Sequence, residues 1–161
     1  MTTQSVIPIP ADEAIFEQNI AILFRSILGD PNVKRVAKRG KVQKGIDVVG
    51  KRDRDPAQAV GIQCKLRTTG RKLTEDEARA ELEKALDFRP KLTEFFIATT
   101  AEDDVTYDEI AAKLSQEQAA QGRTIDVQIW GWTTLQDRIG EDQKALDAFY
   151  PDSSPLTRRL E

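Results

Sequence analysis

The 161-residue sequence contains no histidine and only one cysteine. Without histidine, the chain cannot use Ser-His or Cys-His catalysis, histidine-containing zinc fingers or histidine-based metal centres. The single cysteine, Cys64, cannot form an internal disulfide and fits a reducing cytoplasm. Any metal ion must therefore be held by oxygen atoms, which favours Mg²⁺, Mn²⁺ or Ca²⁺.

Long hydrophobic runs are also absent from the sequence. No apolar stretch approaches the roughly 20 residues that span a bilayer, and residues 1–10 lack the basic start and apolar centre of a signal peptide. We therefore expect a cytoplasmic protein with no membrane partner. The length, with 39% hydrophobic and 32% charged residues, favours a single globular domain over residues 1–150. We expect residues 151–161 to form a tail or a linker to a further domain.

The charged residues are distributed unevenly along the chain. The net charge is −3, but residues 34–72 contain 13 Lys and Arg against three Asp, a local charge of +10. The remaining sequence has 11 basic and 24 acidic residues, a charge of −13. A basic segment in an acidic chain is typical of a protein that binds phosphate groups. The alternative is that the two signs mark only two solvated surfaces.

Hydrophobic periodicity and turn signals predict alternating helices and strands. Helices are expected at residues 10–29, 74–88, from 103 or 104 to near 122, 133–139 and 142–149. Strands are expected at residues 32–36, 46–50, 59–66, 93–100 and 125–130. Thr74 and Glu77 should form a capping box, and Asp103 or Asp104 should cap the third helix. Because later strands alternate with helices, we expect an α/β protein with a mixed central sheet flanked by helices.

Two neighbouring strands carry polar side chains that should share one surface. Strand side chains alternate, so the apolar even-numbered residues from 60 to 66 face the core. Gln63 and Lys65 then lie together on the other face, beside Gly61, which should leave open space. Asp47 lies between two apolar residues of the preceding strand. A carboxylate, an amide and an ammonium group are therefore expected to converge.

The first helix contributes a fourth polar group. At about 100° per residue, Glu17 falls within the apolar stripe, close to Phe24 and Leu28. Burying an unpaired carboxylate costs several kcal/mol, so Glu17 requires a partner such as a metal cation. The alternative is a structural salt bridge to Lys65 or Arg25.

These motifs resemble the PD-(D/E)xK nuclease superfamily. Its Mrr-like branch is matched by Glu17 in a Phe-Glu first helix, by the Gly-Ile-Asp sequence ending at Asp47, and by the Gln-Cys-Lys sequence from Gln63 to Lys65. Gln63 stands where the broad superfamily has Asp or Glu. The expected element order matches the restriction-endonuclease-like core (αβββαβ), extended here by a further helix, a strand and short C-terminal helices. Residues 95–101 and 129–132 are similar to N-terminal nuclease domains of bacterial anti-phage effector proteins.

The resemblance implies a Mg²⁺-dependent endodeoxyribonuclease, with Mn²⁺ as a substitute, that hydrolyses phosphodiester bonds in double-stranded DNA. Glu17, Asp47, Gln63 and Lys65 would be its catalytic residues. Asp47, Gln63 and Glu17 would bind the metal ion, while Lys65 would orient the attacking water and stabilise the transition state. We also expect a homodimer or higher oligomer when active, and a role in anti-phage defence or restriction.

Seven basic residues near these motifs are expected to contact DNA phosphates, which would set affinity rather than sequence choice. They are Lys38, Arg39, Lys41, Lys44, Arg67, Arg71 and Lys72. Three alternative functions stay open. The chain could be a catalytically silent nucleic-acid-binding module, a junction-resolving nuclease of the same fold, or an interaction scaffold whose basic face binds an acidic protein.

Overall fold

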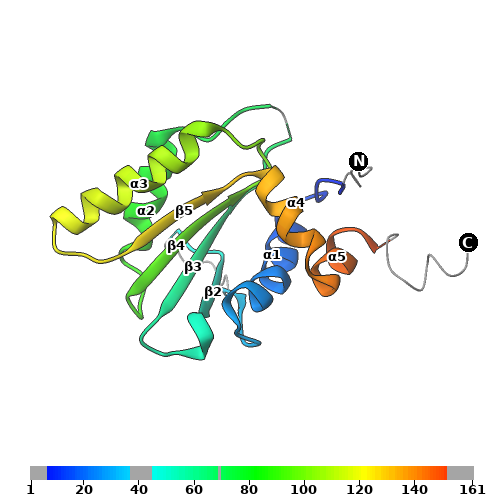
Figure 1. Ribbon diagram of the computed structural model, residues 1–161, viewed down its shortest axis with the longest axis horizontal. Coiled ribbons are helices and arrows are strands. Elements are labelled where there is room, and N and C mark those ends of the chain that lie inside the picture. Colours follow the sequence, from blue (N-terminus) through cyan, green and yellow to red (C-terminus); the bar gives the residue numbers. More distant parts are fainter. Residues whose placement is uncertain (1–6, 37–44, 69, 152–161) are drawn as a thin grey trace, which may run out of the picture.

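The computed structural model describes residues 7–36, 45–68 and 70–151 (Figure 1). In chain order, the elements are α1 (Glu13–Leu28), β1 (Lys34–Arg35), β2 (Val48–Lys51), the 3₁₀ helix η1 (Arg52–Arg54), β3 (Ala59–Lys65), α2 (Glu75–Ala85), β4 (Leu92–Thr99), α3 (Val105–Ala120), β5 (Asp126–Trp130), α4 (Trp132–Gly140) and α5 (Gln143–Phe149). This alternation of helices and strands confirms the predicted α/β class.

The five strands form one mixed sheet in the order β1-β2-β3-β4-β5. Strands β1, β2 and β3 are antiparallel neighbours, whereas β3, β4 and β5 are parallel. Strand β3 is therefore where the pairing changes. Its residue Ile62 pairs with Val48, the first residue of β2, but β3 continues to Lys65, which pairs with Thr99 of β4. Within the described ranges, the last three residues of β3 thus have a strand neighbour on one side only.

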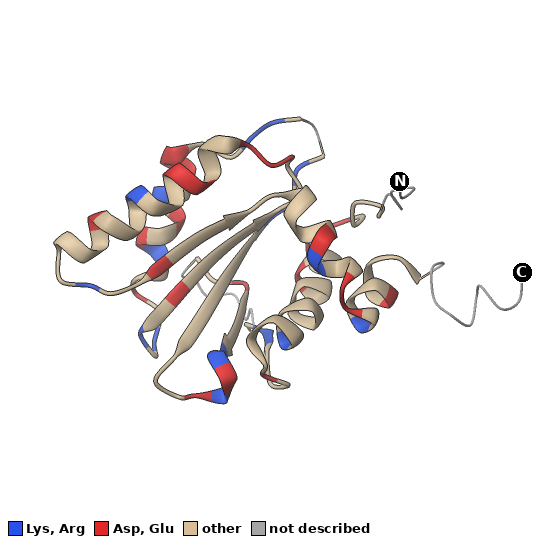
Figure 2. Cartoon of the chain, in the orientation of Figure 1, with Lys and Arg blue, Asp and Glu red and all other residues tan. Residues whose placement is uncertain are grey.

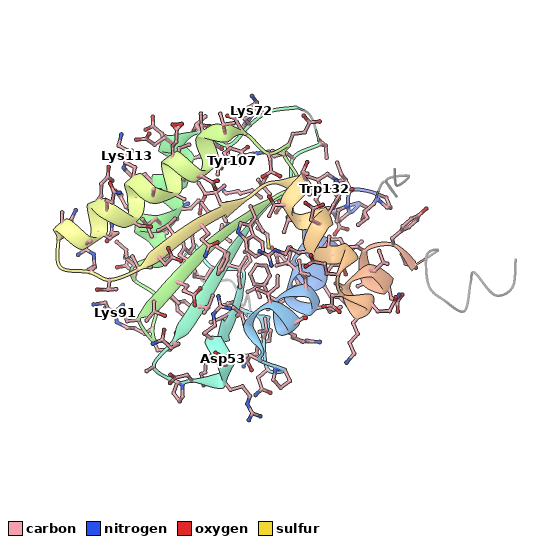
Figure 3. The ribbon with its side chains drawn as sticks, viewed as in Figure 1. Asp53, Lys72, Lys91, Tyr107, Lys113 and Trp132 are labelled. Carbon is pink, nitrogen blue, oxygen red and sulfur yellow. The ribbon has the colours of Figure 1, made fainter. Side chains whose placement is uncertain are left out.

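Helices cover both faces of the sheet, as expected (Figure 1). Helices α1, α4 and α5 share one hydrophobic core with the inward side chains of β3 and β4, such as Ile62 and Phe96. Helices α2 and α3 share a second core with Phe95 and Ile97. Successive residues of β4 therefore enter different cores, which explains its continuous apolar run. Tyr107 of α3 lies in the second core, where its hydroxyl accepts a hydrogen bond from the Leu73 N–H at 3.1 Å (Figure 3).

Side-chain caps set the beginnings of two helices. Helix α1 begins at Glu13 because the Asp12 carboxylate accepts a hydrogen bond from the Ile15 N–H at 2.8 Å. Pro10, which was expected in the first turn, precedes the helix. Gly29 ends α1 in the left-handed conformation, with φ +65°. The predicted capping box at the start of α2 is confirmed, since the side chain of each partner bonds the backbone of the other.

Asp103 caps a different helix from the one predicted. Asp104 occupies the N-cap position of α3 but makes no capping hydrogen bond with its side chain. The Asp103 carboxylate instead accepts hydrogen bonds from the N–H groups of Gly131 and Thr134, at 2.9 and 2.7 Å. These N–H groups belong to the start of α4, so Asp103 links the end of β5 to the loop that follows β4.

Membrane insertion was also considered. Within residues 7–36, 45–68 and 70–151, every helix is too short or too polar to cross a bilayer. The expected tail lies outside the described residues, apart from Pro151.

Candidate active site

A polar cavity of about 250 Å³ lies at the start of β2 and the end of β3, and is called the site cavity here. All four of the predicted catalytic residues line it: Glu17, Asp47, Gln63 and Lys65. They come from α1, from the segment before β2, and from β3. The structure therefore brings together the groups that the sequence predicted would converge.

Asp47 is held in place by the edge of β3. The segment that carries it reaches β3 one residue before β2 begins, where the Asp47 N–H donates to the Ile62 carbonyl at 2.9 Å. One carboxylate oxygen then accepts a hydrogen bond from the Cys64 N–H at 2.8 Å. Asp47 is only 2% exposed. A buried carboxylate that accepts a backbone N–H is stabilised in its charged form, which a cation ligand requires.

Gly45 allows this segment to pack against helix α2. Its φ is +66°, a conformation that favours glycine. A Cβ atom at this position would lie 2.8 Å from the carbonyl oxygen of Glu81 and 2.9 Å from the Cβ of Lys84. Both distances are too short for any other residue without movement of the helix. Gly45 thus sets how closely the strand that follows Asp47 approaches α2.

Gln63 and Lys65 have different surroundings although they lie side by side on β3. The Oε1 atom of Gln63 is buried and accepts no hydrogen bond from any described residue. Lys65 has a partner, because its Nζ lies 2.5 Å from Oε2 of Glu81. The space beside Gly61, expected to be open, is instead filled by Ile46 and Leu92, whose methyl groups would lie 2.5 and 2.8 Å from an added Cβ.

Glu81 is a cavity residue that the sequence analysis missed. It lies on α2, is 7% exposed, and accepts ion-pair contacts from both Lys65 and Lys84, the latter at 3.8 Å. A signal was present, because Glu81 occupies the same helix face as the buried residues Ala78, Leu82 and Ala85. The argument applied to Glu17, that an acid in an apolar stripe needs a partner, applies equally to Glu81.

Glu17 is 3% exposed, and its Oε1 accepts a hydrogen bond from Nη2 of Arg35 at 3.1 Å. The alternative salt bridges expected for it were wrong. Lys65 pairs with Glu81, and Arg25 donates to the carbonyl of Val33 at 3.1 Å. The Arg35 side chain is 40% exposed, so this contact reaches the protein surface. Arg35 therefore connects edge strand β1 to the site cavity.

The donor set of the site cavity fits a hard cation only in part. Among the described residues there is no group of three His, Cys, Asp or Glu side chains placed to hold a metal ion. The candidate ligands are two carboxylates, Asp47 and Glu17, and the amide oxygen of Gln63. A buried amide oxygen without a hydrogen-bond donor is an acceptor that a cation can satisfy. Such a set leaves several ligand positions to water, which is usual for Mg²⁺.

The predicted phosphate contacts fall into two groups. Lys38, Arg39, Lys41 and Lys44 lie outside the described residues. Arg67 and Arg71 both pair with Glu77, at 2.5 and 3.2 Å, and Lys72 pairs with Asp104 at 3.5 Å. Each cation of the second group is therefore already balanced by an acid.

Two of those acids have altered acidity. Burial raises the pKa of Glu77, but the Thr74 N–H and the guanidinium groups of Arg67 and Arg71 outweigh it and lower that pKa below its usual value. The Thr106 hydroxyl, with Lys72, lowers the pKa of the Asp104 carboxyl. Both acids are thus stabilised as anions, which strengthens their competition with DNA phosphates for these cations.

Comparisons of the chain with protein-family models and with curated proteins find no match. The motifs, the sheet order and the geometry of the site cavity are therefore the basis for assigning a function.

Proposed function

We propose that this protein is a Mg²⁺-dependent endodeoxyribonuclease with a restriction-endonuclease-like core, which hydrolyses phosphodiester bonds of double-stranded DNA. One observation carries the proposal. Glu17, Asp47, Gln63 and Lys65, which come from three segments of the chain, line one polar cavity. The helix, three strands, helix, strand order from α1 to β4, with β3 parallel to β4, agrees with that core. We place its action in the cytoplasm, as an oligomeric effector of anti-phage defence or restriction.

The proposed cation ligands are Asp47, Glu17 and the amide oxygen of Gln63. A bound Mg²⁺ would supply Lewis acidity and lower the pKa of a coordinated water. Asp47 is the ligand fixed most firmly, through its bonds to β3. Gln63 contributes no charge, so the anionic ligands set most of the affinity.

Lys65 acts on the phosphate rather than on the cation. Its ammonium lies on the same side of β3 as Gln63, so it can donate to a phosphate oxygen or to the attacking water. Glu81 accepts from this ammonium and restricts it to one region of the cavity. Because an ammonium has three N–H donors, two stay available for the substrate. Glu81 is therefore a positioning residue for Lys65.

Plasmid nicking tests the proposal directly. The purified protein is incubated with supercoiled plasmid in Mg²⁺ and in EDTA, beside Asp47→Ala and Lys65→Ala. We expect relaxed and linear products only for the parent protein in Mg²⁺. A four-way junction as a second substrate tests the junction-resolving alternative. Duplex binding in EDTA with no cleavage of either substrate in Mg²⁺ would instead favour a catalytically silent binding module.

A further inference from the structure

A second concave surface lies at the edge of the sheet. It is a groove of about 290 Å³ formed by β1, β2, the η1 turn and the segment after α2, and is called the edge groove here. Phe88, Pro90 and Val49 form an apolar floor, and Lys34, Lys51 and Arg54 lie around it. The η1 turn, marked by Asp53 in Figure 3, carries basic and acidic residues side by side (Figure 2).

The three cations of the edge groove are unbalanced. Lys34, Lys51 and Arg54 are exposed, and none has an ion-pair partner among the residues that the structure describes. This contrasts with Arg67, which pairs with an acid. Cations that gather without acids, in a chain of net charge −3, leave a local positive potential that favours an anionic partner.

The acids nearest the groove do not neutralise these cations. Asp30 lines the groove but is 2% exposed, and its two carboxylate oxygens accept the backbone N–H groups of Asn32 and Lys51, at 2.9 and 2.8 Å. Asp55 accepts the N–H of Ala57 at 2.9 Å. Asp53 is exposed on the turn. These carboxylates either stabilise the backbone or face solvent.

Arg54 adopts an unfavourable backbone conformation. Its φ is +61° and that of Asp53 is +53°, both in the left-handed region that glycine adopts without strain. An arginine at this position does not favour the turn. Its presence is more readily explained by what its side chain does in the edge groove.

The edge groove and the site cavity lie along the same two strands. Asp47 comes just before β2 and Lys51 ends it, so they are about 13 Å apart at 3.3 Å per residue. Duplex DNA rises about 3.4 Å per base pair, so this separation corresponds to about four base pairs. One duplex could therefore reach both places.

We propose that the edge groove binds the sugar–phosphate backbone of the double-stranded DNA substrate, with Lys34, Lys51 and Arg54 as its phosphate contacts. This inference rests on the proposed nuclease function and identifies where the substrate is held beyond the site cavity. The three cations contact phosphate oxygens, and the apolar floor faces the deoxyribose. Such contacts increase affinity for any sequence and do not select one.

Duplex binding without cleavage tests the groove. A fluorescent duplex of about 20 base pairs is titrated in EDTA between 50 and 200 mM salt. The parent protein is compared with Lys34→Gln/Lys51→Gln/Arg54→Gln and with the control Lys91→Gln/Arg138→Gln/Lys144→Gln. The control removes the same charge from exposed residues that also lack an ion-pair partner among the described residues. We expect the groove variant to lose about 2.7 in the slope of log K against log salt, at about 0.9 per contact, and the control to keep most of the slope.

Arg54→Gly separates binding from structure. Glycine relieves the left-handed strain, so we expect an unchanged or higher Tm together with weaker DNA binding. A purely structural role for Arg54 predicts the reverse, a lower Tm with unchanged binding.

The outcomes distinguish this inference from the proposed function. If the parent binds and cleaves DNA while the groove variant and the control have equal slopes, the groove inference is wrong and the nuclease proposal stands. If the parent binds duplex but cleaves nothing in Mg²⁺, the nuclease proposal falls and the salt slopes still decide the role of the groove. If the parent does not bind duplex, both are overturned.

Discussion

Lys65 and Asp47 have opposite charges and opposite effects on a cation, although they line the same cavity. Asp47 would attract Mg²⁺ in the ground state, whereas the Lys65 ammonium opposes it and becomes useful only when negative charge builds on the phosphate. The buried pair of Lys65 with Glu81 reduces that opposition. At the residue scale, cation binding and cleavage should therefore be separable by mutation.

Asp47→Ala should remove most of the affinity for Mn²⁺, measured by calorimetry. Lys65→Ala should bind Mn²⁺ at least as tightly as the parent and yet cleave at least about 100-fold more slowly. Gln63→Glu restores the commoner acid and should tighten Mn²⁺ binding. Cleavage by Lys65→Ala at the parent rate would show that this mechanism is wrong.

Glu81→Gln should slow cleavage at saturating DNA and Mg²⁺ by about 10- to 100-fold, as is usual for a residue that orients a functional group. Because Glu81 acts through Lys65, the same change in the Lys65→Ala background should cause no further loss. The Kd for Mn²⁺ should stay the same, since Glu81 is not a proposed ligand. Glu83→Gln, an exposed change on the same helix, is the control. Equal losses in both backgrounds would contradict a positioning role.

Helix α2 is the element that organises the site cavity from one side. It supplies Glu81, and its backbone contacts Gly45 so closely that a Cβ atom would not fit. Its first turn also holds Arg67 and Arg71 through Glu77. A small shift of α2 therefore changes the position of both Lys65 and the segment carrying Asp47.

Gly45→Ala should destabilise the protein by about 1–3 kcal/mol, the usual cost of a side chain held at positive φ, and reduce cleavage further through the shift of α2. Urea denaturation gives the free energy of unfolding. Gly140→Ala is the matched control, because it lies in α4 with open space around its Cβ position. There alanine should be neutral or stabilise by up to about 1 kcal/mol. A loss for Gly45→Ala no larger than that of the control would show that the contact is unimportant.

The start of α2 should also make stability dependent on pH. The pKa of Glu77 is lowered in the folded protein, so its ionised form favours folding. This contribution is fully present above the unfolded pKa of about 4.3 and is lost as the pH falls through the lower folded value. Glu77→Gln should therefore unfold more easily at pH 7 but lose less stability than the parent on acidification to pH 3. Parallel curves for the two proteins, measured by thermal unfolding, would contradict this assignment.

At the scale of the whole molecule, the sequence was sufficient for the sheet and for most of the site. Period-two alternation placed Gln63 and Lys65 together, and the helical stripe placed Glu17 toward the same cavity. These patterns report which face a residue occupies. They do not report partners from distant segments, which explains the wrong salt bridges of Glu17 and the missed residue Glu81. The filling of the space beside Gly61 by Leu92 likewise depends on the parallel pairing of β3 and β4.

Mg²⁺ should stabilise the whole fold if it binds in the site cavity. A ligand that binds only the native state at 100 times its Kd adds about 2.7 kcal/mol to the free energy of unfolding. We expect a higher Tm in Mg²⁺ for the parent and for Lys65→Ala, with reversal by EDTA. Asp47→Ala should show no such increase. An equal increase in all three proteins would place the cation elsewhere.

The hydrogen bond from the Cys64 N–H to the Asp47 carboxylate has a consequence for spectroscopy. This amide belongs to a strand, yet its proton is bonded to a side chain rather than to a neighbouring strand. Its ¹H–¹⁵N resonance should therefore respond to the electron density on that carboxylate. Diamagnetic Mg²⁺ would withdraw density and move the Cys64 peak upfield in the proton dimension, while the Ile62 amide, which pairs with β2, would move little. A single NMR titration could thus follow occupancy of the site without any substrate.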